Sequence, residues 1–107
     1  MKLYWCTRTR SVRTIWLLEE AGIGYRRELA DIRNPETTGG GFRAASPMGK
    51  VPAIMDTLDN GTVYMADSAA ICLYLADRYA CGRLAPTLDD AARGRYLYWM
   101  TYTPGAI

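Results

Sequence analysis

The first part of the chain alternates between two periods of apolar spacing, one typical of strands and one typical of a helix. Residues 2–5 and 25–29 are short runs that predict strands. Between them, residues 11–21 have the spacing of a helix that Ser11 is expected to cap and Gly22 to end. The apolar stripe of this helix consists of Val12, Ile15, Trp16 and Leu18. A strand that follows a helix directly indicates a βαβ unit, so the two strands are expected to pair in parallel.

The middle of the chain passes from a loop to a hairpin and then to a second helix. Residues 31–46 contain an Asn-Pro pair and three successive glycines, which predict a long loop with at most a short helix at 42–45. Short strands are predicted at 52–55 and 63–65, and the Asp59-Asn60-Gly61 turn between them is typical of an antiparallel hairpin. A helix is predicted from Asp67-Ser68 to about residue 79. Its apolar face consists of Ala70, Ile71, Tyr74 and Leu75.

The order of these elements, βαβ, loop, ββα, indicates an α/β fold, a thioredoxin-like sandwich with a four-stranded mixed sheet. Residues 1–82 are assigned to this domain, and residues 83–88 are interpreted as a linker. Residues 89–107 are interpreted as the start of a truncated all-α domain, with a helix at 89–102. One side of this helix carries Ala92, Tyr96, Trp99 and Met100. A helix this rich in exposed aromatic residues is expected to dock on another copy of the chain or to be poorly ordered.

Composition excludes several classes of function. The net charge of the 107-residue chain is +2, which is too small to indicate nucleic-acid binding. No apolar run is long enough for a membrane span, and the start MKLYWC lacks the apolar core of a signal peptide. Three cysteines without a C-x-x-C pair favour a reduced, cytoplasmic protein. Because the chain has no histidine, a His-based catalytic triad and a His-ligated metal are excluded, and no metal site is expected.

Four segments together resemble the signature of cytosolic glutathione S-transferases. The first is residues 1–5, followed by Ser11-Val12-Arg13 and by residues 16–22. The second is SPMGKVPAI at residues 46–54, and the third is DSAAICLYL at residues 67–75. The fourth is Leu84-Ala85-Pro86, where the family's interdomain linker begins. The segments follow the family's order and spacing over residues 1–102, so the chain resembles the N-terminal, thioredoxin-like domain of bacterial-type members.

The resemblance implies a glutathione-binding site made from the second and third segments. Pro52 is expected to follow a cis peptide bond, which lets the backbone of Val51 hydrogen-bond the cysteinyl unit of glutathione. Ser68 lies at a helix N-terminus, where free N–H groups and the helix dipole favour the γ-glutamyl carboxylate. Asp67 would face the ammonium group, although either residue could simply cap the helix. Lys50 or Arg43 would bind the glycyl carboxylate of glutathione, although either could also be a solvated surface cation.

The family's reaction needs glutathione as a thiolate, since the thiolate is the nucleophile. Aligning the first strand and the first helix without gaps places the candidates for stabilising this anion at Thr9, Arg10 and Ser11. Ser11 combines a hydroxyl group with the helix start, and it could also be a plain cap. Arg10 supplies a cation where some relatives have a catalytic cysteine.

The resemblance implies a transferase that conjugates glutathione, its co-substrate, to a small electrophile or reduces a peroxide, acting as a homodimer. Two alternatives remain open. One is a non-catalytic dimerisation or interaction module of the same fold, and retention of Asp67 and Ser68 speaks against it. The other is a glutathione-dependent thiol reductase acting through Cys6. That cysteine has no second cysteine nearby and lies too far before the helix to benefit from its dipole, so it is interpreted as a bystander.

Overall fold

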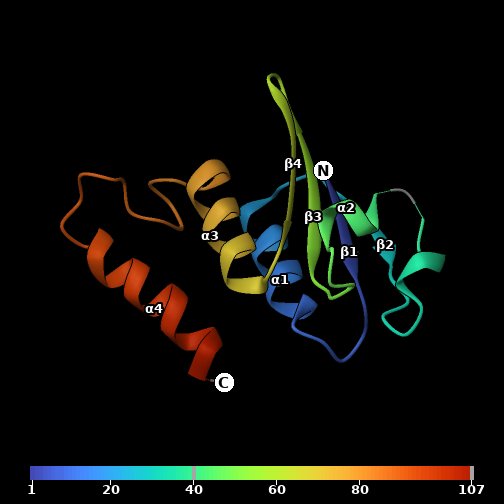
Figure 1. Ribbon diagram of the computed structural model, residues 1–107. Helices are drawn as coiled ribbons and strands as arrows, with labels where there is room; N and C mark the ends of the chain where they lie inside the picture. Colours follow the sequence, from blue (N-terminus) through green and yellow to red (C-terminus); the bar gives the residue numbers. More distant parts are fainter. Residues whose placement is uncertain (40, 107) are drawn as a thin grey trace.

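The computed structural model describes the backbone at residues 1–39 and 41–106, and side chains within these ranges except at 37 and 103–106. Gly40, from the predicted loop, and Ile107, from the predicted last segment, lie outside the described residues. The elements follow one another in the order shown in Figure 1: β1 (Lys2–Trp5), α1 (Ser11–Ala21), β2 (Arg26–Leu29), the 3₁₀ helix η1 (Pro35–Thr37), α2 (Phe42–Ala45), β3 (Ala53–Leu58), β4 (Gly61–Ala66), α3 (Ser68–Tyr79) and α4 (Arg93–Ala106).

The four strands form one mixed sheet in the order β2-β1-β3-β4. β1 runs parallel to β2 and antiparallel to β3, and β3 runs antiparallel to β4. The predicted thioredoxin-like fold with a four-stranded mixed sheet is therefore confirmed, including the parallel βαβ unit and the antiparallel hairpin. The hairpin strands are longer than predicted, because their pairing continues from Ala53 opposite Ala66 to Leu58 opposite Gly61.

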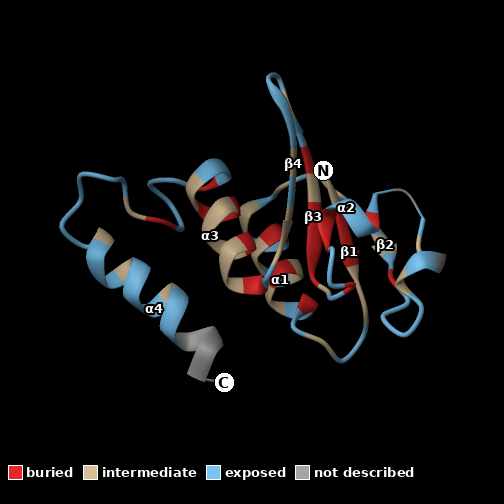
Figure 2. Cartoon of the chain, in the orientation of Figure 1, coloured by how far each residue is buried: buried red, intermediate tan, exposed pale blue. Residues whose placement is uncertain are grey.

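Helices cover both faces of the sheet, with α1 and α3 on one face and α2 on the other (Figure 1). Neighbouring residues of one strand point to opposite faces, so β1 contributes Leu3 to one core and Tyr4 to the other. The larger core is formed by the fully buried side chains of Leu3, Leu18, Ile54, Ile71 and Leu75. Burying each such aliphatic side chain stabilises the fold by about 1.5–3 kcal/mol. Figure 2 shows this buried layer along β1, β3, α1 and α3.

Helix α1 buries part of the predicted stripe, since Leu18 is buried and Ile15 packs against the larger core. Its buried residues are Ser11, Thr14 and Leu18, whereas Val12 and Trp16 are 63% and 69% exposed. The helix starts one residue earlier than a Ser11 cap requires, because Arg10 occupies the N-cap position without a side-chain cap bond and Ser11 is the first helical residue. The predicted stop at Gly22 is confirmed, since this glycine has a φ of 68° and its N–H donates to the carbonyl of Glu19.

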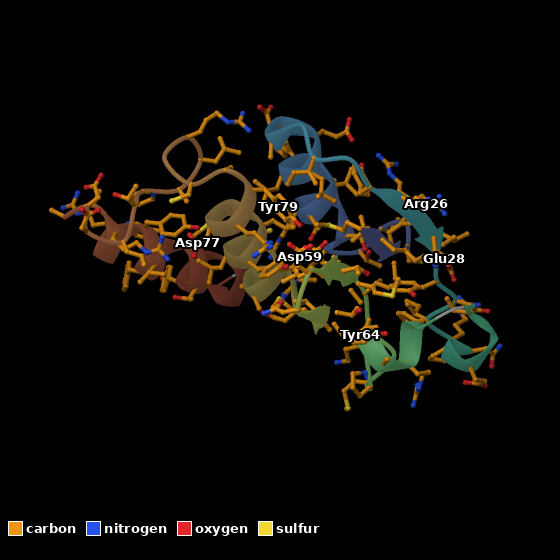
Figure 3. All side chains as sticks on the ribbon, turned by 90° about the horizontal axis from the view of Figure 1, so that it is seen from above. Arg26, Glu28, Asp59, Tyr64, Asp77 and Tyr79 are labelled. Atoms are coloured by element: carbon orange, nitrogen blue, oxygen red, sulfur yellow. The ribbon has the colours of Figure 1, made fainter. Side chains whose placement is uncertain are left out.

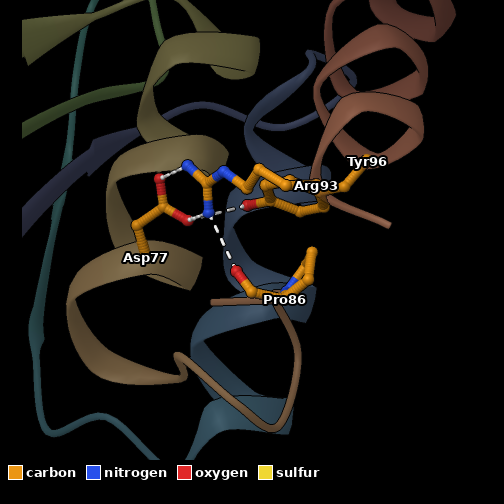
Figure 4. A network of polar contacts seen from close by, with 4 residues as sticks. All are labelled: Asp77, Pro86, Arg93 and Tyr96. Carbon is orange, nitrogen blue, oxygen red and sulfur yellow. Dashed lines mark hydrogen bonds and ion pairs between the residues drawn. The ribbon is translucent and has the colours of Figure 1, made fainter. Parts of the chain in front are cut away.

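The last helix, α4, starts at Arg93 instead of residue 89 and continues to Ala106, past the predicted end at 102. It is an ordered helix that packs against α3 of the same chain, and its docking on another copy stays a prediction. The Arg93 guanidinium donates to both carboxylate oxygens of Asp77, at 2.8 and 2.7 Å, and to the carbonyl of Pro86 at 3.0 Å (Figure 4). Trp99, predicted on the packed side, is 54% exposed.

A buried carboxylate that the sequence analysis missed ties the hairpin to α3. Asp56, on β3, is 3% exposed and accepts hydrogen bonds from the hydroxyl groups of Tyr74 at 2.7 Å and Tyr79 at 2.5 Å. Burial and the bond to this carboxylate raise the pKa of Tyr74. Seen from above, Tyr79 and Asp77 lie on α3, while Arg26 and Glu28 mark β2 at the far edge of the sheet (Figure 3).

Candidate functional site

A pocket of about 550 Å³ opens where three segments meet: the β1–α1 loop, the turn before β3 and the junction of β4 with α3. Five of the six candidates for glutathione binding line it, namely Lys50, Val51, Pro52, Asp67 and Ser68. Four further lining residues were not predicted, and they are Ser46, Pro47, Met48 and Ala66. The topology thus brings the second and third sequence segments to one place.

The turn before β3 is held in shape by a buried serine. Ser46 is 1% exposed, and its hydroxyl donates to the carbonyl of Lys50 at 2.7 Å and accepts from the Lys50 N–H at 2.8 Å. Directly after this turn, the peptide bond between Val51 and Pro52 is cis, as the resemblance implied. A short polar residue directly before a proline was the sequence signal for this role, because such residues often close turns through their own side chains.

Gly49 completes the same turn. Its φ of +69° lies in the left-handed region, and a β-carbon at this position would lie 2.6 Å from Cγ of Pro35. Arg43, the second candidate for the glycyl carboxylate, is exposed on α2, and one of its guanidinium nitrogens lies 3.3 Å from the same β-carbon position. It is not among the described residues that line the pocket.

The junction of β4 with α3 combines a strained residue with an unpaired hydroxyl. Asp67 has a φ of 82°, and its carboxylate accepts from the Ala70 N–H at 3.1 Å, so it is the N-cap of α3. Ser68 is 4% exposed, and its hydroxyl has no hydrogen-bond partner among the described residues, although the residue lines the pocket. A buried polar group without a partner costs about 1–3 kcal/mol, which a bound hydrogen-bonding ligand would offset.

The three catalytic candidates occupy different places in the β1–α1 loop. Arg10 lines the pocket, whereas Thr9 and Ser11 are absent from its described lining. The Thr9 hydroxyl lies 2.7 Å from the Cys6 carbonyl oxygen and 2.8 Å from the Ser11 hydroxyl. Ser11 is 1% exposed and also accepts from the Cys6 N–H at 3.4 Å. The two hydroxyl groups therefore hold the loop that carries Arg10.

Among the described residues that line the pocket, the charged groups are two cations and one carboxylate. Arg10 and Lys50 supply the positive charges, and Asp67 supplies the negative charge. The N-terminus of α3 adds a partial positive charge, because its first N–H groups have no partner within the helix. Within the described ranges, no three His, Cys, Asp or Glu side chains gather as a metal site would, and no helix has the length and apolar character of a membrane span.

The cysteines lie outside this pocket. Cys6 is half-buried and lines a separate cavity on the β2 side of the sheet. Burial raises the pKa of the Cys72 thiol. Cys81 is exposed.

Comparison with known proteins identifies a family for this chain. Residues 5–78 match the model of "Glutathione S-transferase, N-terminal domain". The chain is 37% identical over 98 residues to glutathione S-transferase hmp2 of Hypomyces subiculosus, an alignment that covers 90% of the chain and 44% of that protein. It is 33% identical over 104 residues to disulfide-bond oxidoreductase YfcG of Escherichia coli, covering 91% of the chain and 46% of that protein. The solved structure of a sphingomonad glutathione S-transferase complexed with glutathione is similar with a TM-score of 0.75 at 32% identity, covering 95% of the chain and 50% of the other. The chain therefore spans about half the length of these relatives or slightly less.

Proposed function

The chain belongs to the glutathione S-transferase family through a domain of the N-terminal type, and from this premise we propose that its pocket binds reduced glutathione and presents the thiolate to a small electrophile. The observation that carries the proposal is the buried, unpaired hydroxyl of Ser68 at the start of α3. The γ-glutamyl carboxylate accepts a hydrogen bond from this hydroxyl and from free N–H groups of the helix. A hydrogen bond to a charged group of this kind contributes about 1.5–3 kcal/mol.

Charge complementarity supports glutathione over a neutral ligand. At neutral pH glutathione carries two carboxylates and one ammonium group, which matches the two cations and one carboxylate of the pocket. The ammonium group faces Asp67, next to the γ-glutamyl carboxylate at Ser68. The glycyl carboxylate faces Lys50, and the cysteinyl backbone pairs with Val51 beside the cis peptide bond.

For thiolate stabilisation, the placement of Arg10 supports a direct role. It lines the pocket, and a guanidinium is charged at all physiological pH values. A cation near the sulfur lowers the pKa of the bound thiol and so raises the fraction of thiolate. Ser11 and Thr9 contribute by fixing the loop, through the hydrogen bonds that join their hydroxyl groups to each other and to Cys6.

In the transferase reaction the thiolate sulfur forms a bond to the electrophilic carbon while the leaving group departs with the electron pair of its own bond. Reduction of a peroxide by glutathione is the second reaction of the same thiolate. A thiol reductase acting through Cys6 has less support, since Cys6 does not line the pocket that contains the charged side chains of Arg10, Lys50 and Asp67. It lines a separate cavity. We also propose a cytoplasmic homodimer, and the exposed rings of Tyr98, Trp99 and Tyr102 on α4 supply apolar surface for a second copy.

Calorimetric titration with glutathione tests the proposal through a matched pair of variants. Ser68→Ala removes the buried hydroxyl that lines the pocket, and Thr14→Val removes a buried hydroxyl on α1 that does not. We expect Ser68→Ala to weaken binding by about tenfold to a hundredfold and Thr14→Val to leave it unchanged. Equal affinities of the Ser68→Ala variant and the unchanged chain would contradict the proposal, and so would no binding by a folded chain.

A further inference from the structure

We propose that a cavity beside the start of β1, the Arg26 cavity, binds the phosphate group of a small soluble phosphomonoester. It has a volume of about 550 Å³, within the range of about 300–1,000 Å³ that is usual for small-molecule pockets. It is lined by residues 1–2, by residues 24–26 and by Met55 and Thr57 of β3. None of the described residues lines both this cavity and the pocket proposed for glutathione.

The sheet places three hydrogen-bond donors around the Arg26 cavity. Lys2 on β1 is in register with Arg26 on β2 and with Met55 on β3. Side chains in register on neighbouring strands lie on the same face of a sheet, and Thr57, two residues after Met55, lies on that face as well. A guanidinium, an ammonium and a hydroxyl from three adjacent strands therefore line one hollow.

Arg26 supplies a positive charge that the described residues do not neutralise. Their ion pairs are Lys2 with Glu28, at 3.2 Å, and Arg93 with Asp77, so Arg26 has no described carboxylate within ion-pair distance. Figure 3 shows Arg26 and Glu28 on β2, at the edge of the sheet. The described lining of the cavity contains no acidic residue. Because Glu28 offsets only one of the two cations, the net charge beside the cavity is positive, which favours an anion.

The other charged groups near the cavity already have partners. The Tyr25 hydroxyl donates to Glu19 at 2.8 Å and accepts from the Arg27 guanidinium at 3.0 and 3.2 Å, so a carboxylate and a cation balance each other there. The last carbonyls of α1 carry a partial negative charge, and two of them accept from the Arg83 guanidinium at 3.3 and 2.8 Å. These contacts leave the charge of Arg26 uncompensated, and they hold the Tyr25 ring in place as a wall of the cavity.

A phosphate group matches these donors better than a carboxylate does. A phosphomonoester has three strong acceptor oxygens, and the cavity offers donors from three strands. Arginine binds phosphate through paired N–H groups, and lysine binds it as a point charge. An ammonium group has more hydrogens than its one bond to Glu28 uses, so Lys2 can bind the anion as well. The side chains of Met1 and Met55 supply an apolar wall for the rest of a small ligand.

Titration with glycerol 3-phosphate, followed through amide chemical shifts, tests the location. The titration is run with and without saturating glutathione, because Arg10, Lys50 and the N-terminus of α3 also attract a phosphate. In both series we expect the largest changes at residues 24–26 and Thr57. Changes centred on Lys50 and Ser68, or no changes in a folded chain, would overturn the proposal.

A matched pair of arginine variants tests the role of the unpaired cation. Arg26→Gln removes it at an exposed position, and Arg95→Gln makes the same change of charge at an exposed residue outside the described lining of the cavity. We expect Arg26→Gln to weaken binding of glycerol 3-phosphate by about tenfold or more and Arg95→Gln to leave it unchanged. Full affinity of the Arg26→Gln variant would overturn the proposal, and so would equal losses in both variants, which an effect of net charge alone would produce.

Control ligands identify the group that is bound. Glycerol, which lacks the phosphate, should not bind, and acetate should bind more weakly than glycerol 3-phosphate. Equal affinity for acetate would contradict a phosphate site. Vesicles that contain phosphatidic acid test the alternative source of a phosphate, a lipid headgroup. Adsorption of the chain to these vesicles without binding of glycerol 3-phosphate would overturn the soluble ligand.

The phosphate site and the proposed glutathione site can fail independently. If the chain does not bind glutathione, the proposed function fails, while changes at residues 24–26 on addition of glycerol 3-phosphate still support the Arg26 cavity. If glutathione binds and residues 24–26 do not respond to glycerol 3-phosphate, only the phosphate site is overturned.

Discussion

Replacing Gly49 by alanine should destabilise the chain more than replacing Gly22, although the two glycines share one backbone conformation. Their φ angles are +69° and +68°. A β-carbon at Gly22 has no heavy atom within 4 Å, whereas at Gly49 it lies 2.6 Å from Cγ and 3.0 Å from Cβ of Pro35. The pair of variants therefore separates the effect of a close contact from the effect of the backbone angle.

The expected magnitudes follow from these distances. Alanine in the left-handed region costs about 1–2 kcal/mol at either position. At Gly49 the ring of Pro35 must also move by about 0.8 Å to increase the separation from 2.6 Å to an ordinary contact of 3.4 Å. Overpacking of this kind costs about 1–3 kcal/mol more. We therefore expect a loss of about 2–5 kcal/mol for Gly49→Ala and about 1–2 kcal/mol for Gly22→Ala.

Urea unfolding followed by circular dichroism measures both losses, and glutathione titration supplies a second readout. The turn that contains Gly49 also carries Lys50 and leads to Val51 in the pocket. Gly49→Ala should thus weaken glutathione binding as well, while Gly22→Ala, outside the described lining of the pocket, should not. Equal losses of unfolding free energy in the two variants would refute the argument from the Pro35 contact.

Three further predictions concern single groups. The hydrogen bond from Arg93 holds the pKa of Asp77 below its ordinary 3.8, so this pair stabilises α4 docking near neutral pH and is lost as the pH falls below that value. The protection factors of the α4 amides, each taken relative to the intrinsic exchange rate at the same pH, should fall there and, at neutral pH, in Arg93→Ala, while those of α1 stay unchanged. Because burial raises the pKa of Cys72, iodoacetamide should modify exposed Cys81 first, and the reverse order would contradict the burial. Arg10→Gln should raise the pKa of the thiol of bound glutathione, which would be measured as a lower thiolate absorbance at neutral pH. An unchanged titration of the thiol would exclude an electrostatic role of Arg10.

The local signals along the chain were sufficient to predict most elements and the sheet. The Asn60-Gly61 turn, the stop at Gly22 and the strand–helix–strand order each have a local cause, and local patterns are visible in one sequence. The residues of the pocket were predicted in another way, through the resemblance of SPMGKVPAI and DSAAICLYL to motifs of the family. The fold brings both segments to the same pocket.

The errors arose where tertiary packing decides. The apolar residues of α1 predict a buried face that includes Val12 and Trp16, but the helix turns Ser11, Thr14 and Leu18 inward. Two small hydroxyl side chains on that face let α1 lie close to its neighbours, which no count of apolar residues reveals. The first residue of α4, Arg93, pairs with Asp77, which lies 16 positions away, and the role of Asp56 likewise depends on contacts with the distant α3.

The most direct test of the central claim is a map of amide chemical-shift changes on titration of the chain with reduced glutathione. A glutathione site built from the turn before β3 and the start of α3 predicts the largest changes at the amides of Val51 and Ser68, with Asp67 and Lys50 next. Residues 29–33, around the separate cavity that Cys6 lines, should change little. Changes centred on residues 29–33, or no changes at saturating glutathione in a folded chain, would contradict the account.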